Sequence, residues 1–428
     1  MKATRKGFFG WRVVGAAFVI AVFGWGISFY GPPIFLQVLH DSRGWPVSLI
    51  SVAITAHFLA GAAVVANLAS CHRRFGVVAV TRAGALLTAF GLLGWAFARE
   101  PWQLFLSTPL SCAGWAMTSG AALNAMVSPW FVRRRPAALS MAFNGASMGG
   151  VLFAPLWVIL ITRLGLAGAA VLVATAVVLV IWFLAGRYLG RDPAAMGLAP
   201  DGGDAATPHP TAQRRTVTSS IPLSRPWRDR RFVTLAAGAA LGLFAQIGLV
   251  AHLFSLLVPT LGEAGAGATI GAATACAIGG RTLVGRLMPW DADRRVVAAA
   301  NVGVQAVGSV MLLCAGRSVP LELLGCGLFG LGLGNVTSLP PLIAQAEFSP
   351  ADVSRVVALV TAISQAGYAF APAVFGLLRD LGSVLGVASS QGSAPLLFTV
   401  AAIIQLAAAG AVLLGRQHAL QEKEALSV

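Results

Sequence analysis

The amino-acid sequence predicts an all-α membrane protein with 12 transmembrane helices in two six-helix bundles. The first observation behind this prediction is composition, because 57% of the 428 residues are hydrophobic and only 11% are charged. A soluble domain carries about 25% charged residues, so the chain lies far outside the soluble class. The second observation is a series of twelve apolar stretches of bilayer length, and the third is the distribution of basic residues between them.

The apolar stretches divide into two sets of six, given that a transmembrane helix needs about 20 mainly apolar residues. The first six candidate spans are 11–36, 46–69, 77–98, 102–128, 137–161 and 166–189. The second six are 232–258, 267–289, 296–316, 320–345, 353–378 and 394–415. The polar stretch between the sets has no helical periodicity, which indicates a loop. The predicted organisation is an N-terminal bundle over 1–189, a cytoplasmic linker over 190–231 and a C-terminal bundle over 232–428.

Lysine and arginine residues orient the chain in the membrane. With the N-terminus inside, 24 of the 30 basic residues fall in inside segments, five fall in outside loops, and the remaining one is Arg281. The positive-inside rule therefore predicts that both termini are cytoplasmic, in a multi-pass protein of the cell (inner) membrane surrounded by lipids. The basic N-terminus precedes a run long enough to span, so we interpret that run as a membrane helix and not as a cleaved signal.

Several other classes of protein are disfavoured. The net charge of +15 is not arranged in the basic and aromatic stripes of nucleic-acid surfaces, so no nucleic-acid partner is expected. The five cysteines are odd in number and lack metal-ligand spacing, which predicts neither a disulfide framework nor a metal site. There is no nucleotide-binding glycine loop and no paired carboxylate. We therefore expect no enzyme and no cofactor, but a monomeric secondary transporter.

Arg281 is the most informative residue, because it lies inside the span 267–289. At about 1.5 Å per residue it is about 21 Å from the outer end of that span. A charge at this depth faces a wet cavity or a partner and by default marks a pathway or a binding site. A guanidinium is permanently charged and its planar fork suits carboxylates. The alternative is an arginine whose side chain extends to the cytoplasmic surface.

Other polar side chains within the spans are candidate substrate contacts or proton carriers. The candidate substrate contacts are amide or phenol groups that can orient a carboxylate without adding charge, or that simply join helices: Tyr30, Asn124, Gln246, Gln365 and Tyr368. His57, near the middle of the second span, can carry a coupled proton because histidine titrates near neutral pH. The alternative is a neutral histidine bonded to a neighbouring helix. For His252, nearer the outer end, we expect a gate or interface role.

A cluster of charges follows the span 267–289. It consists of Asp291, Asp293, Arg294 and Arg295. These side chains can form a salt-bridged cytoplasmic latch that favours one state of a transport cycle, or they can be a solvated loop. Exposed pairs contribute only about 0–1 kcal/mol, so such a latch would bias an equilibrium and not lock it.

Several motifs resemble the major facilitator superfamily, and within it the monocarboxylate and oxalate/formate branch. That branch's first span resembles Gly10-Trp11-Arg12-Val13-Val14 followed by Phe29-Tyr30-Gly31-Pro32. Its loop into the fifth span resembles Trp130-Phe131-Val132-Arg133-Arg134-Arg135-Pro136-Ala137 and then Asn144-Gly145-Ala146-Ser147-Met148-Gly149. Its eighth span, where the arginine is the substrate anchor, is similar to Arg281-Thr282-Leu283-Val284-Gly285-Arg286. The resemblance implies the major facilitator fold, with a substrate site between its two halves.

The chain also departs from the pattern of that branch. The aspartate that precedes the arginine by one turn in proton-coupled members is Ala277 here, and the lysine that often follows the first-span proline is Pro33. The lysine of oxalate-type exchangers is absent from Ser364-Gln365-Ala366-Gly367. The acidic residue of the loop after the second span is not present in Ser70-Cys71-His72-Arg73-Arg74-Phe75-Gly76. The resemblance therefore implies an anion anchor without the usual coupling group.

The predicted function is secondary active transport of small organic anions of the monocarboxylate type, by alternating access. The expected partners are the organic anion and either protons, for symport, or a counter-anion, for exchange. One alternative is an efflux pump for hydrophobic or cationic compounds, which would favour a mid-span acid that this sequence lacks. The other is a non-transporting membrane solute sensor, for which the chain offers no extra soluble domain.

Overall fold

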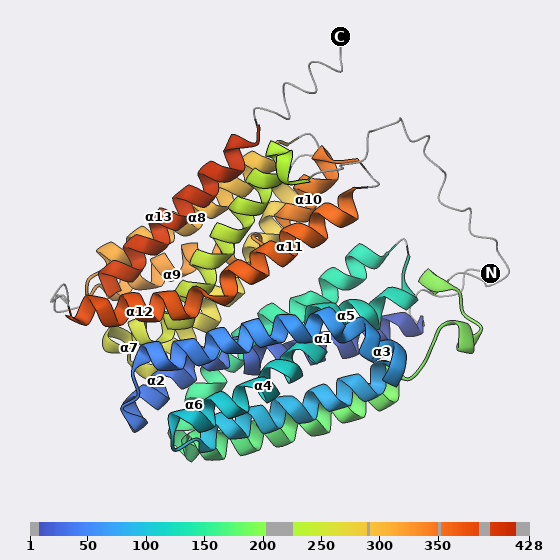
Figure 1. Cartoon of the computed structure of the whole chain (residues 1–428), viewed down its shortest axis with the longest axis horizontal. Helices are drawn as coiled ribbons and strands as arrows, with labels where there is room; N and C mark the ends of the chain where they lie inside the picture. Colours follow the sequence, from blue (N-terminus) through green and yellow to red (C-terminus); the bar gives the residue numbers. More distant parts are fainter. Residues whose placement is uncertain are drawn as a thin grey trace, which may run out of the picture. The chain divides into compact units, whose positions relative to one another are not determined.

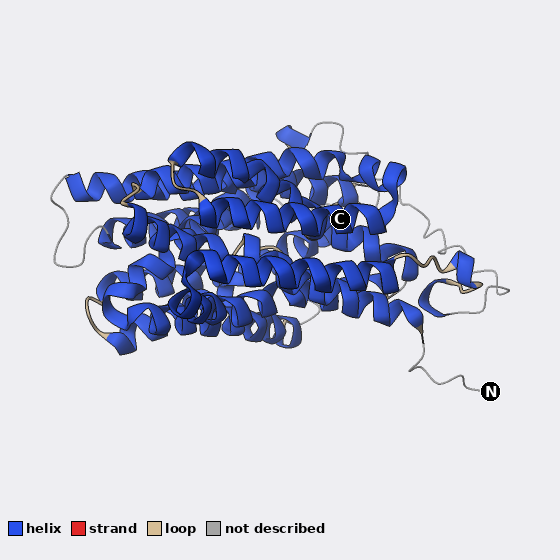
Figure 2. Ribbon diagram, turned by 90° about the horizontal axis from the view of Figure 1, so that it is seen from below, coloured by secondary structure: helices blue, strands red, loops and turns tan. Residues whose placement is uncertain are grey.

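The described residues of the computed structural model form helices and no strand (Figure 2). These residues are 8–132, 134–202, 226–288, 292–349, 352–384 and 394–416. Among them, 7 helical stretches are long and apolar enough to cross a membrane. The predicted all-α membrane architecture is confirmed, while the number of twelve spans stays a prediction.

The helices are labelled in Figure 1 and follow one another in chain order. Those of the first half are α1 (Phe9–Ser28), α2 (Gly31–Arg43), α3 (Val47–Phe97), α4 (Pro101–Thr118), α5 (Gly120–Val127), η1 (Ser128–Trp130), α6 (Arg135–Leu184), η2 (Ala185–Leu189), η3 (Ala194–Met196) and η4 (Pro200–Gly202). Those of the second half are η5 (Pro226–Arg228), α7 (Arg230–Leu287), α8 (Arg294–Cys314), α9 (Val319–Leu333), α10 (Leu339–Glu347), α11 (Val353–Ala369), α12 (Ala371–Val384) and α13 (Ala394–Leu414).

Three of these helices are too long to be single membrane spans. α3, α6 and α7 have 51, 50 and 58 residues, whereas a helix of about 20 residues already crosses the hydrocarbon core. Each is interrupted by a glycine at positive φ: Gly76 at 78°, Gly165 at 68° and Gly262 at 67°. Only glycine adopts this region without a steric cost from Cβ. Each long helix is therefore two helices joined at a glycine, and the breaks lie between predicted spans.

The chain forms two compact units. Unit 1 contains Met1–Pro32 and Ala56–Thr218, and unit 2 contains Pro33–Thr55 and Ser219–Val428. This differs from the predicted division, which assigned all of 1–189 to one bundle. The segment 33–55 belongs to unit 2 because it packs on α12, where the backbone N–H of Ala373 donates to Oγ1 of Thr55 at 3.0 Å.

In unit 1, α1 packs closely along the first part of α6. An added Cβ at Gly149 would lie 2.7 Å from the carbonyl oxygen of Val22, and one at Gly145 would overlap the Phe18 carbonyl. Trp157 of α6 donates its indole N–H to the carbonyl of Gly26 at 3.0 Å. The small residues that the sequence places in this helix therefore allow backbone contact between the two helices.

In unit 2, α8, α9 and α13 pack together (Figure 1), and α9 also contacts the part of α7 after Gly262. This second contact is made through glycines. An added Cβ at Gly280 would overlap the carbonyl of Leu331, and one at Gly330 would overlap the carbonyl of Ala273. The close approach of α7 and α9 fixes the position of the residues that follow Gly280, which include Arg281.

The first testable prediction concerns Gly280→Ala. We expect it to lower the free energy of unfolding by about 1–3 kcal/mol, because the methyl group meets a helix backbone that cannot move without disturbing the packing. The matched control is Gly279→Ala on the same helix, where an added Cβ meets nothing within 4 Å. Thermal unfolding of the detergent-solubilised protein measures both variants. Equal melting temperatures for the two would contradict the close contact of α7 with α9.

Candidate functional site

Arg281 lies on α7 close to the end of that helix at Leu287. Its side chain is half-buried, and Nε donates a hydrogen bond of 3.2 Å to the carbonyl oxygen of Gly334. An added Cβ at Gly334 would lie 2.6 Å from the carbonyl oxygen of Ala277 and 3.2 Å from the guanidinium. The guanidinium is therefore held against the backbone at the end of the neighbouring helix α9 in unit 2.

The carbonyl that Arg281 contacts belongs to a break between two helices. α9 ends at Leu333, α10 begins at Leu339, and the residues between them form turns. Pro340 and Pro341 at the start of α10 have no N–H, so the carbonyls of Val336 and Thr337 have no helical donor. The Gly334 carbonyl lies two residues earlier. It accepts from Nε of Arg281 and, at 3.4 Å, from the hydroxyl of Ser338.

Three of the predicted substrate contacts lie on α7 and α11, which pack against each other in unit 2. Gln246 is buried, and its Oε1 has no hydrogen-bond partner within the described residues. Gln365 and Tyr368 are half-buried. An unsatisfied amide oxygen is costly to bury, so Gln246 retains an acceptor that a water or a ligand donor can use.

His57 lies on α3 in unit 1 and is buried at 3% exposure. Its Nδ1 is 2.9 Å from Oγ of Ser111, and that hydroxyl donates its own hydrogen to the carbonyl of Thr108. Ser111 therefore accepts from His57, which assigns the ring proton to Nδ1. Nε2 is then the unprotonated nitrogen, and it is buried with no hydrogen-bond partner in the part of the chain described.

The other two predicted substrate contacts are also in unit 1, but not in one cluster. Tyr30 lies between α1 and α2, and its ring meets Phe29 edge-on at 5.0 Å. Phe29 is 6.3 Å from Phe58, whose ring is 5.4 Å from His57, so aromatic contacts connect Tyr30 with His57. Asn124 is exposed on α5 and accepts a hydrogen bond of 2.6 Å from the hydroxyl of Ser128.

His252 is fully buried on α7 in unit 2. Its Nε2 is 3.1 Å from the carbonyl of Pro372 on α12. A carbonyl only accepts, so this nitrogen carries the ring proton. The side chain of Ser255 bonds both the carbonyl of His252 and the guanidinium of Arg379. His252 thus joins α7 to α12.

The charged residues at the start of α8 have partners elsewhere in unit 2. Asp293 caps α8 through the N–H of Arg295 and pairs with Arg416 at 2.6 Å. Arg295 pairs with Glu347 at 2.6 Å, and Arg294 donates to the carbonyl of Leu342. These contacts join helices within unit 2. Asp291 lies outside the described residues.

The carboxyl group of Asp293 lies outside the membrane-spanning helices. Burial alone raises the pKa of Asp293, but hydrogen bonds from Arg416 and from the backbone of Val296 and Arg295 outweigh it, so its pKa lies below the usual value. The group is therefore a carboxylate at neutral pH and serves as a helix cap and an ion-pair partner.

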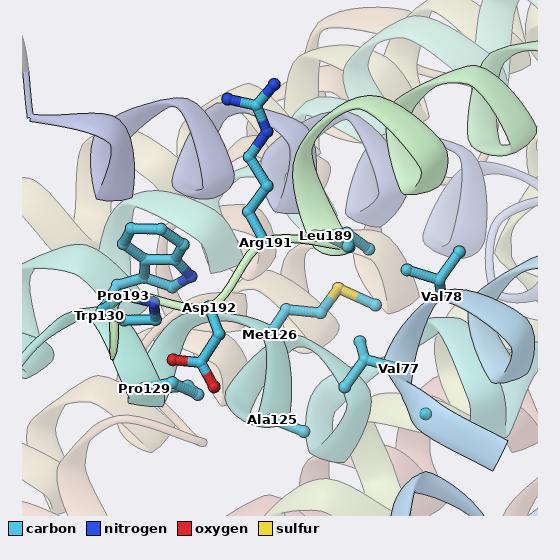
Figure 3. Close-up of a pocket in the computed structure, with 12 residues that line it drawn as sticks. Val77, Val78, Ala125, Met126, Pro129, Trp130, Leu189, Arg191, Asp192 and Pro193 are labelled. Carbon is cyan, nitrogen blue, oxygen red and sulfur yellow. The ribbon is translucent and has the colours of Figure 1, made fainter. Parts of the chain in front are cut away.

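A cavity of about 330 Å³ lies elsewhere in unit 1 (Figure 3). Met126 and Trp130 extend into it, and Asp192 lies at its margin while Arg191 points away. Its lining residues are Gly76, Val77, Val78, Ala125, Met126, Pro129, Trp130, Leu189, Gly190, Arg191, Asp192 and Pro193. None of the predicted substrate contacts is among them.

Sequence reasoning missed two polar residues beside the break whose Gly334 carbonyl Arg281 contacts. Asn301 and Asn335 are buried beside the break and hydrogen-bond each other at 3.0 Å. The signal that could have located the break is Pro340-Pro341, which lies inside the predicted span 320–345 a few residues after its glycine-rich part. The partner of Arg295 was also missed, because Glu347 is 52 residues away in the chain.

Comparisons with known proteins agree with this architecture. The model of the Major Facilitator Superfamily matches residues 14–372. Monocarboxylate transporter 11 of Mus musculus is 28% identical over 397 residues, which cover 87% of this chain and 82% of that protein. Monocarboxylate transporter 11 of Homo sapiens is 27% identical over 407 residues, with coverage of 93% and 76%. MFS-type transporter 1 of an Ophiocordyceps species is 26% identical over 365 residues, with coverage of 79% and 72%.

Solved structures show the same fold at low identity. A bacterial homolog of the human lysosomal transporter Spinster matches with a TM-score of 0.71 and 14% identity, over 97% of this chain and 98% of that one. The nucleoside transporter NupG matches with a TM-score of 0.68 and 11% identity, over 95% and 99%. The family and these relatives are membrane transporters and not enzymes. The chain is thus a multi-pass membrane transporter that belongs to the major facilitator superfamily.

Proposed function

We propose that this transporter moves small monocarboxylates or related organic anions by alternating access, with Arg281 binding the carboxylate group. The observation that carries the proposal is the half-buried guanidinium fixed to the Gly334 carbonyl beside the α9–α10 break. It is supported by relatives of nearly full length that are named monocarboxylate transporters. Broken helices near the middle of the membrane are where carriers of this architecture bind their substrates.

The geometry of Arg281 indicates how the carboxylate is bound. Nε donates to the Gly334 carbonyl, which fixes the plane of the guanidinium. A planar guanidinium held in this way favours a planar anion such as a carboxylate, through charge-assisted hydrogen bonds. The polar contacts that we propose in addition are Tyr30, Asn124, Gln246, Gln365 and Tyr368.

His57 is the group that we propose for proton coupling. Its Nε2 has a lone pair and no partner among the described residues, while Nδ1 is held by Ser111, so the ring can take up one proton without changing its orientation. The aspartate of proton-coupled relatives is replaced by Ala277, which leaves this histidine as the titratable group of the pathway. His252 has a gating role in this proposal.

The orientation and the latch are proposals as well. The excess of basic residues in inside segments supports cytoplasmic termini in the cell (inner) membrane, with lipid around a monomer. The ion pairs of Asp293 with Arg416 and of Arg295 with Glu347 support a latch that stabilises the cytoplasmic end of unit 2.

The proposed function is tested in liposomes that contain the purified protein. We expect labelled acetate or lactate to exchange against the unlabelled anion, and an inward proton gradient to increase net uptake. His57→Gln should remove the effect of the gradient and leave the exchange, because an amide can still bond Ser111 but does not titrate near neutral pH. Uptake with and without the gradient measures both effects.

The matched control is His72→Gln, which changes a half-buried histidine at the other end of the same helix segment and should keep the response to the gradient. Retention of the response in His57→Gln would exclude His57 as the coupling group. Exchange without any response in the unmodified protein would replace proton symport by anion exchange. Transport of cationic or hydrophobic probes, with none of carboxylates, would overturn the assignment to anions.

A further inference from the structure

Two buried asparagines lie beside the break between α9 and α10. Asn301 on α8 is 8% exposed and Asn335, two residues after the end of α9, is 2% exposed. Burying amide groups in an apolar bundle is costly unless each finds a hydrogen-bond partner. The contacts of these two side chains therefore show what they stabilise.

Both asparagines bind the backbone around the break or each other. Asn301 donates from Nδ2 to the carbonyl of Gly332 at 3.1 Å, and its Oδ1 accepts from Nδ2 of Asn335 at 3.0 Å. The backbone N–H of Asn335 donates to the same Gly332 carbonyl at 3.2 Å. This carbonyl therefore has two donors, neither of which is the helical donor four residues later.

The residue between these contacts is the one that holds Arg281. Gly334 lies between Gly332 and Asn335 in the chain, and its carbonyl accepts from Nε of Arg281 at 3.2 Å. Neither glycine has room for a side chain, since a Cβ at Gly332 would overlap Gln305 and one at Gly334 would approach Ala277. The end of α9 thus lies between α8 and α7. The amide of Asn301 on α8 contacts it from one side, and the guanidinium of Arg281 on α7 contacts it from the other.

We propose that Asn301 and Asn335 are positioning residues for Arg281. They hold the turn between α9 and α10 in place, so that the Gly334 carbonyl points at Arg281 and fixes the plane of its guanidinium. This inference rests on the proposed function, because it assigns to the pair the orientation of a carboxylate-binding group. The pair does not contact the substrate.

The experiment measures KM and maximal rate for labelled lactate in liposomes. Asn301→Ala, Asn335→Ala and the milder Asn301→Ser should each raise KM by about tenfold or more, the scale expected when a binding group is displaced slightly. Their maximal rates should change less than their KM values. The control is Ser309→Ala on the same helix, which removes a buried hydrogen bond of 2.8 Å to Gln405 that does not involve the break. It should lower the melting temperature similarly and leave KM unchanged.

A double substitution distinguishes positioning from general destabilisation. If the pair acts through Arg281, Asn301→Ala should raise KM no further in the background of Arg281→Lys. Additive effects, or a rise in KM for Ser309→Ala as large as for Asn301→Ala, would overturn the inference. Unchanged transport in Arg281→Lys alone would instead overturn the proposed function, so the two failures are distinguishable.

Discussion

Replacing Arg281 with lysine should lower the transport of a monocarboxylate at limiting concentration by about 10- to 100-fold, although the charge is kept. Hydrogen bonds to charged groups contribute about 1.5–3 kcal/mol each, which corresponds to this range. A lysine ammonium is a single point of charge on a flexible stem, so it cannot bond the Gly334 carbonyl and also present two parallel donors to a carboxylate. Initial rates of labelled lactate uptake in liposomes give the ratio of maximal rate to KM for each variant.

The control for this experiment is Arg286→Lys. Arg286 is exposed in the last turn of the same helix, so its substitution should change uptake by no more than about twofold. Arg281→Ala removes the charge altogether and should abolish saturable uptake. If Arg281→Ala transports at the rate of the unmodified protein, Arg281 does not bind the anion and the assignment to carboxylates is lost.

Much of the fold could be predicted from sequence because its signals are local. Apolar stretches of bilayer length give the helices, and charged residues between them give the turns. The breaks at Gly76, Gly165 and Gly262 lie between predicted spans for this reason. The segment 33–55 belongs to unit 2 because of contacts such as that of Thr55 with Ala373. These two residues are 318 positions apart in the chain, so their contact leaves no periodic signal in the sequence.

The candidate site, like the fold, could be predicted only where its residues leave a local signal in the sequence. Arg281 could be recognised because a charge inside an apolar stretch is exceptional on its own. Asn301 and Asn335 could not, because an amide in a span is commonly a contact between helices, and only the geometry shows that these two meet at a break. The latch residues could be recognised as charged, but the partner of Arg295 could not be predicted, because Glu347 is 52 residues away in the chain.

Arg295 forms a buried ion pair with Glu347, and each nitrogen of its guanidinium has a hydrogen-bond acceptor. Arg295 is 1% exposed, and its Nε and Nη2 donate to the two carboxylate oxygens of Glu347 at 2.6 and 2.7 Å. Its remaining N–H groups donate to the carbonyls of Arg231 and Val412 and to the hydroxyl of Thr234. One guanidinium therefore joins α7, α8, α10 and α13, beside an apolar cluster that includes Phe348.

Glu347→Gln should consequently destabilise the protein by about 3–5 kcal/mol, because it leaves a buried guanidinium without its counter-charge. The amide also turns one N–H toward the donors of Arg295, where the carboxylate had an acceptor. At this size of ΔΔG the melting temperature in detergent should fall by about 3–6 °C for a chain of this length. Thermal unfolding followed by tryptophan fluorescence measures the change.

Two further variants show whether the loss comes from the unpaired charge. Asp293→Asn breaks the pair with Arg416, whose side chain is 47% exposed, and should cost about 0–1 kcal/mol. Replacing both partners, with Arg295→Met and Glu347→Leu, should recover a large part of the stability lost in Glu347→Gln, because neither side chain then buries a charge. A double variant that is less stable than Glu347→Gln would show that the bonds of Arg295 to the backbone of α7 and α13 contribute more than its pairing with the carboxylate.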